Sequence, residues 1–160
     1  MCVGKWFCSL AKSIGGCTPK VYPTDYNVYS TTFAAVRDDL KALGLVCMDD
    51  NLPDVNFYYT DSADWKKIIP YLTYSAEYYA ESERKDCDDY SKKASADASF
   101  YLGLNVIQAW GTMPDGYHAF NLVKTDTGYM VFEPNAGWEC AGELLELDNK
   151  YEWKADKWKS

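Results

Sequence analysis

The chain has 160 residues, 48% of them hydrophobic and 16% aromatic, with a net charge of −8. This length fits a single domain with a real core, and the hydrophobic content excludes a disordered acidic chain. The negative charge argues against nucleic acid or an anionic membrane as a partner, and no apolar run reaches the roughly 20 residues that span a bilayer.

The first 60 residues are predicted to be largely helical. Apolar residues recur at helical spacing over residues 3–14, and glycines follow directly. Residues 30–32, Ser-Thr-Thr, can cap a helix that runs to about Leu43, with Gly44 as its C-terminal stop. The start lacks the apolar stretch of about 7–15 residues that a signal peptide requires, which favours a cytoplasmic protein.

Helices are also expected in the middle of the chain. Asp61 begins a helix that Pro70 kinks or ends, and residues 71–82 are predicted to be helical and lined with tyrosines. A longer helix is predicted from Cys87 to about Leu102, and the small residues on its inner face indicate close packing against a neighbour.

Strands are predicted in the last third of the chain, over residues 104–110, 117–123 and 129–132, with a shorter one at 144–147. Helices followed by strands are typical of an α+β fold, here N-terminal helices packed on a C-terminal antiparallel sheet. Residues 1–160 are expected to form one domain. Its N-terminal part, 1–60, has no role that the sequence assigns, and its tail, 148–160, combines charged residues with two tryptophans.

A cysteine, a histidine and a carboxylate follow one another in an order typical of a nucleophile site. Cys87 begins the long helix, His118 is the only histidine and lies in a predicted strand, and Glu133 and Asn135 end the next strand. A thiol, an imidazole base and an orienting polar group are the components of cysteine-dependent catalysis. The alternative for His118 is a buried histidine of purely structural role.

The predicted hairpin places the imidazole near its orienting group. If Lys124 pairs with Tyr129 across a four-residue loop, then His118, Glu133 and Asn135 share one face of the sheet. We expect Glu133 to orient the imidazole, with Asn135 as the second choice. A three-residue loop would place the groups on opposite faces.

Acidic residues surround the cysteine. Asp86 is a good N-cap and Asp89 lies where a capping box has its acid, but with Asp88 they crowd negative charge around the thiol, which opposes thiolate formation. Either an imidazolium at His118 offsets this charge, or Asp88 and Asp89 hold calcium, which prefers carboxylate oxygens. The alternative for both aspartates is ordinary negative charge at a helix N-terminus.

The six cysteines are predicted to be mostly free thiols. No pair has the spacing of a zinc knuckle, and any disulfide is expected among Cys2, Cys8 and Cys17.

The segments 86–90, 116–121 and 132–135 together resemble the papain-like cysteine peptidase domain at the C-terminus of a mushroom agglutinin, which has phage and bacterial relatives. They are more distantly similar to transglutaminase-like cysteine proteinases. The resemblance covers roughly residues 65–140. It implies a papain-like fold, Cys87 as nucleophile, His118 as base, Glu133 as orienting acid and calcium at Asp88 and Asp89.

Three functions compete at this point. The first is a cysteine-dependent hydrolase or acyl transferase with a Cys-His-Glu triad and a peptide or protein substrate. Its chemistry requires no cofactor, and calcium is the one cofactor that the aspartates allow. The second is a non-catalytic binding or structural protein, such as a phage accessory protein, for which the location would include the virion or the host cell. The third is a metal site that uses Asp88, Asp89, His118 and Glu133 without thiol chemistry.

Overall fold

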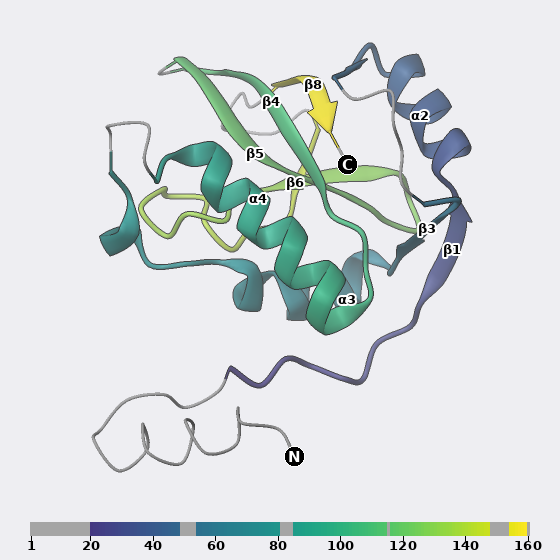
Figure 1. The fold of residues 1–160 in the computed structure, drawn as a ribbon, viewed down its shortest axis with the longest axis horizontal. Coiled ribbons are helices and arrows are strands. Elements are labelled where there is room, and N and C mark those ends of the chain that lie inside the picture. Colours follow the sequence, from purple (N-terminus) through teal and green to yellow (C-terminus); the bar gives the residue numbers. More distant parts are fainter. Residues whose placement is uncertain (1–19, 49–53, 81–84, 115, 148–153, 160) are drawn as a thin grey trace.

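A six-stranded mixed sheet is the centre of the molecule (Figure 1). The computed structural model describes residues 20–48, 54–80, 85–114, 116–147 and 154–159. The strand order is β2-β8-β4-β5-β6-β7, and only β2 and β8 pair in parallel. The strands are β2 (Val46–Cys47), β4 (Ile107–Met113), β5 (Gly116–Lys124), β6 (Tyr129–Phe132), β7 (Leu145–Glu146) and β8 (Lys154–Lys159).

A second, two-stranded sheet comes from the N-terminal part of the chain. Its strands, β1 (Tyr29–Thr32) and β3 (Asn56–Tyr59), pair antiparallel. β1 leads directly into helix α2 (Phe33–Ala42), whose N-cap Thr32 accepts a hydrogen bond from the Ala35 N–H at 3.1 Å.

Two further α-helices lie on the other side of the sheet from α2. Asp61 caps α3 (Ser62–Ile68), which continues into the 3₁₀ turn Ile69–Leu72. Helix α4 (Cys87–Asp97) ends in a π-helical turn, Ala98–Leu102, and Gly103 at φ 63° terminates it. Helices often end with a residue in the left-handed conformation, and glycine adopts this conformation without a steric penalty.

Helix α4 packs closely on β5. The Ser91 hydroxyl donates to the Phe120 carbonyl at 2.9 Å, and the Asn121 amide donates to the Ser91 carbonyl at 3.0 Å. Ala94 and Ala98 are fully buried, so small side chains let the helix approach the sheet. This contact fixes the position of Cys87, the first residue of α4, relative to β5.

The core has two parts, because side chains alternate between the two faces of the sheet along each strand. Phe120 and Leu122 of β5 pack with α2 and Trp158, whereas Val123 packs with α3 and α4. Successive strand residues point to opposite faces, so both faces of the central strands are covered.

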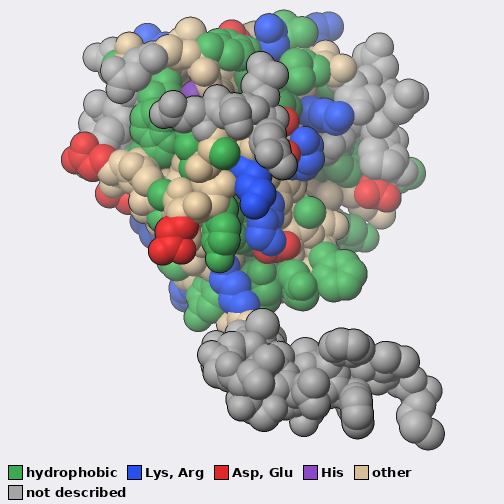
Figure 2. Space-filling model, turned by 60° about the vertical axis from the view of Figure 1, so that its left-hand side comes forward, with side chains coloured by type: hydrophobic (Ala, Val, Ile, Leu, Met, Phe, Trp, Pro, Cys, Tyr) green, Lys and Arg blue, Asp and Glu red, His purple; other side chains and the backbone are tan. Residues whose placement is uncertain are grey.

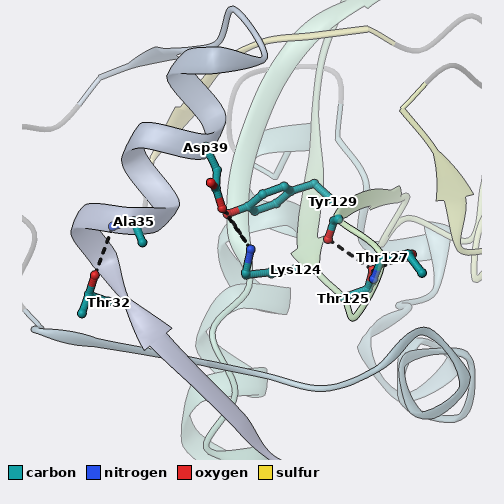
Figure 3. A network of polar contacts seen from close by, with 8 residues as sticks. Thr32, Ala35, Asp39, Lys124, Thr125, Thr127 and Tyr129 are labelled. Carbon is teal, nitrogen blue, oxygen red and sulfur yellow. Dashed lines mark hydrogen bonds and ion pairs between the residues drawn. The ribbon is translucent and has the colours of Figure 1, made fainter.

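A polar network fastens α2 to the β5–β6 hairpin (Figure 3). Asp39 accepts hydrogen bonds from the Lys124 ammonium at 3.0 Å and from the Tyr129 hydroxyl at 3.1 Å. The Lys124 ammonium also lies 4.6 Å from the centre of the Tyr129 ring, in a cation–π contact.

The structure corrects the predicted fold class. Within the described residues, eight strands form two sheets, and strands lie before, between and after the helices, so the arrangement is not N-terminal helices packed on a C-terminal antiparallel sheet. β1, β2 and β3 come from the segment expected to be helical, and β8 comes from the tail. The expected helix over 71–82 is also wrong, because Tyr74 pairs through its backbone with Pro134 and Ala136.

Other local predictions are confirmed. Thr32 and Asp61 cap their helices, β5 and β6 lie where strands were expected, and Lys124 pairs with Tyr129. The helix expected over residues 3–14 lies outside the described residues. No described helix is long and apolar enough to cross a membrane.

Candidate functional site

His118 and Glu133 form a buried charge pair. His118 Nε2 lies 2.9 Å from Glu133 Oε2, and the two residues are 5% and 0% exposed. The other carboxylate oxygen of Glu133 accepts the Asn135 N–H at 2.7 Å, so both oxygens have a donor. Glu133 therefore orients the imidazole, as the hairpin register predicts.

Cys87 completes this group from the start of α4. Burial alone would lower the pKa of His118, but hydrogen bonds with the Cys87 and Glu133 side chains and the charges of both residues outweigh it, and the pKa rises to about 9. Burial raises the pKa of Glu133, while the hydrogen bond and charge of His118 and the Asn135 N–H oppose that rise. At neutral pH the imidazole is therefore charged. A charged imidazole is the first of the two predicted ways, an imidazolium or a calcium ion, of offsetting the acidic surroundings of the thiol.

Asn135 and Trp138 lie beside this pair in different roles. The Asn135 side chain accepts the Gly137 N–H at 3.0 Å, so it stabilises its own loop, and Glu133 is the group that contacts the imidazole. The ring of Trp138 lies 4.8 Å from the His118 ring and provides an apolar wall.

The aspartates around Cys87 lie close together. Asp86, Asp88 and Asp89 each offer one carboxylate oxygen, and these oxygens lie within 4.8 Å of one another. Asp86 is at the N-cap position, but its side chain makes no cap hydrogen bond. Its pKa is raised, first by a hydrogen bond with the Asp88 side chain and then by burial and the Asp88 charge. Such a cluster fits a hard cation such as calcium, and it adds Asp86 to the predicted pair.

Three cysteines are described, and all are thiols. Cys47, Cys87 and Cys140 form no disulfide, in line with the expected free thiols, whereas Cys2, Cys8 and Cys17 lie outside the described residues.

A cavity of about 450 Å³ lies on another side of α4. Its walls are the segment 73–75 with Tyr78, the α4 residues Asp89, Tyr90 and Lys93, and two lysines from elsewhere in the chain, Lys20 and Lys85. Figure 2 shows lysine and arginine side chains in a band down one face of the molecule, with hydrophobic side chains on either side.

Three tyrosines shape this cavity, which is called the tyrosine pocket below. The Tyr90 hydroxyl donates to the Ser75 carbonyl at 2.6 Å, and the Tyr74 hydroxyl donates to Asp97 at 2.9 Å. Tyr74 and Tyr90 meet edge to face at 6.4 Å, while Tyr78 is 61% exposed. The density of tyrosines over residues 71–82 is the signal in the sequence that could have indicated this pocket.

Comparison with known proteins gives a fold likeness only. No family model and no curated protein matches the sequence. Among solved structures, the chain resembles the PSL1a–E64 complex, with a TM-score of 0.60, 19% identity, and 82% of this chain and 51% of the other covered. It also resembles Polyporus squamosus lectin bound to the human-type influenza-binding epitope Neu5Aca2-6Galb1-4GlcNAc, with a TM-score of 0.59, 20% identity, and coverages of 82% and 49%.

These likenesses correct the family and the function inferred from the sequence. Both solved structures are of a lectin, so the assignment to the papain-like or transglutaminase-like cysteine peptidases is withdrawn, together with the hydrolase or acyl transferase function and the peptide substrate. The chain spans about half the length of each lectin chain. The catalytic roles of Cys87, His118, Glu133 and Asn135 and the metal roles of Asp88 and Asp89 stay predictions.

Proposed function

We propose that the chain is a non-catalytic carbohydrate-binding protein whose ligand occupies the tyrosine pocket. The observation that carries the proposal is the combination of aromatic rings and hydroxyl groups in one cavity of about 450 Å³. A sugar ring has apolar C–H faces and a polar rim, and tyrosine offers both a flat apolar surface and a hydroxyl. Pockets for small ligands combine an apolar lining with a few placed polar groups in this way.

The order within the pocket supports this proposal. The Tyr74 and Tyr90 hydroxyls are held by Asp97 and the Ser75 carbonyl, so both rings are fixed before a ligand arrives. Fixed rings lose little conformational entropy on binding. Tyr78, by contrast, is largely exposed, so its ring is accessible to a ligand.

The likeness to a lectin supports the same class of function without assigning the ligand. The lectin structure contains a bound glycan, but this chain covers only about half of the lectin chain, at 20% identity. The proposal therefore depends on the pocket of this chain.

The test is a glycan array probed with the intact chain, followed by titration calorimetry of the glycans that bind. We expect Tyr78→Ala to weaken binding about tenfold, because losing a ring–sugar contact costs on the order of 1.4 kcal/mol. Tyr117→Ala is the matched control, since Tyr117 is 52% exposed and bonds to Asp156 on the β8 side of the molecule.

A Cys87→Ala variant separates binding in the pocket from any role of the thiol. A protein that binds sugar through the tyrosine pocket keeps its full affinity when the thiol is removed. Absence of binding to every glycan, or equal affinities of the Tyr78→Ala variant and the wild type, would contradict the proposal.

A further inference from the structure

The tyrosine pocket is a local concentration of positive charge on a negative chain. Among the described residues that line it, three are lysines, Lys20, Lys85 and Lys93, and one is a carboxylate, Asp89. The chain as a whole has a net charge of −8. Uncharged sugars do not require three ammonium groups, so this charge needs its own explanation.

Asp97, behind the pocket wall, already neutralises one of the three lysines. Its Oδ2 atom accepts hydrogen bonds from the Lys93 ammonium at 3.0 Å and from the Tyr22 and Tyr74 hydroxyls at 3.0 and 2.9 Å. Burial alone would raise the pKa of Asp97, but these three donors lower it, so the carboxylate is ionised. Asp97 thus fixes both Tyr74 and Lys93 in place.

The other two ammonium groups remain available to a ligand. The Lys20 and Lys93 ammonium groups lie 4.9 and 4.8 Å from the centre of the Tyr74 ring. The Lys85 ammonium lies 6.0 Å from the centre of the Tyr78 ring. Within the described part of the chain, neither Lys20 nor Lys85 forms an ion pair. Burial and the nearby Lys93 charge lower the pKa of Lys20, and the charge of Asp97 partly offsets this fall. An additional negative charge in the pocket would therefore stabilise the Lys20 ammonium.

We propose that the pocket selects sugars that carry a carboxylate, which Lys20 and Lys85 bind while the tyrosine rings pack against the sugar. This inference rests on the proposed function and specifies its ligand class. Because both ammonium groups lie over aromatic rings, a sugar acid in the pocket meets the ring face and the positive charge together.

The test compares sugars that differ only in one carboxylate: glucose with glucuronate, galactose with galacturonate, and mannose with mannuronate. Each is titrated into the isotope-labelled intact chain, and binding is followed by amide chemical shifts and saturation transfer. We expect at least one acid to bind about fivefold or more tightly than its neutral partner, the gain expected from one or two ammonium contacts near a protein surface. The preference should shrink when salt is raised from about 0.02 M to about 0.5 M.

The charge variants assign the effect to the pocket. Lys20→Gln and Lys85→Gln together should abolish the preference for the acid over its neutral partner. Lys66→Gln is the matched control, because it removes the same charge from an exposed position on α3. Inorganic phosphate serves as a competitor, and displacement of the neutral sugar by phosphate at the same concentration as the sugar acid would show a general anion site and overturn the selectivity.

The outcomes distinguish the two proposals. If acid and neutral sugar bind equally, or if the double variant keeps the preference, the inference about the carboxylate is overturned and carbohydrate binding stands. If no sugar of any pair binds and the glycan array is also blank, the proposed function itself is overturned.

Discussion

The single histidine permits a direct test of the buried charge pair. In the Glu133→Gln variant, the side chain keeps its shape and loses the negative charge that lies 2.9 Å from His118. Without that charge, burial, which lowers the pKa of the imidazole, is opposed mainly by the Cys87 side chain. We therefore expect the pKa of His118 to fall from about 9 toward its ordinary value of 6.5.

The same change affects stability in a defined pH range. The rise of the His118 pKa from 6.5 to about 9 corresponds to roughly 3 kcal/mol of folding free energy at about 1.4 kcal/mol per tenfold change in proton affinity. This stabilisation is present in full below pH 6.5, the ordinary value, and is lost as the pH rises through 9. In Glu133→Gln the free energy of unfolding should vary less with pH over that range, because the pKa of His118 lies closer to its ordinary value.

The assay uses the one imidazole resonance of the chain. Its chemical shift is followed by NMR from pH 5 to pH 10, and the free energy of unfolding is measured by urea titration at about pH 6.5 and about pH 9. The Tyr117→Phe variant controls for a change on the same strand that leaves the pair intact. An ordinary pKa for His118 in the wild type, or the same raised pKa in Glu133→Gln, would refute the electrostatic argument.

Three further predictions concern the thiols, the aspartates and the sheet. A thiol-directed electrophile should label Cys87 faster than Cys140, because burial raises the pKa of Cys140 to about 11. Peptide mapping of the labelled chain gives the two rates, and faster labelling of Cys140 would contradict this prediction. Calcium should raise the melting temperature of the wild type and of Cys87→Ala but not that of Asp88→Asn. A calorimetric scan of the wild type without any calcium-dependent shift would contradict the predicted cation site. Gly111→Ala should destabilise the chain by roughly 3 kcal/mol or more, because the added methyl would overlap the Lys154 carbonyl at 1.8 Å, and a urea midpoint equal to that of the wild type would contradict this.

The predictions from sequence succeeded where the determining contacts are local. The register of the β5–β6 hairpin follows from a four-residue loop and the alternation of side chains, and it correctly places Glu133 beside His118. Likewise, Thr32 and Asp61 act as caps within three residues of their partners. These contacts depend on short stretches of chain whose geometry the sequence alone restricts.

The failures share a dependence on distant partners. Strand β8 was not predicted because its sequence, Lys-Ala-Asp-Lys-Trp-Lys, is highly charged, yet Trp158 is buried at 1% exposure between β2 and β4. The segment around Tyr74 was expected to be helical, but its backbone bonds to the loop after β6 instead. In both cases tertiary pairing overrides the local preference of the sequence.

The tyrosine pocket was missed for the same reason, and its construction explains why α4 matters. The helix directs Cys87 and Ser91 toward the sheet, while Tyr90 and Lys93 line the pocket on another side. The sequence indicates only the first set, because a cysteine and a lone histidine form a familiar pattern and scattered lysines do not. The second set can be recognised as a site only in the folded chain, where Lys20, the 73–78 segment and α4 line one cavity. Since Cys87 does not line the pocket and Tyr78 is not among the groups that shift the pKa of His118, replacing Cys87 should leave sugar binding intact, and replacing Tyr78 should leave the pKa of His118 unchanged.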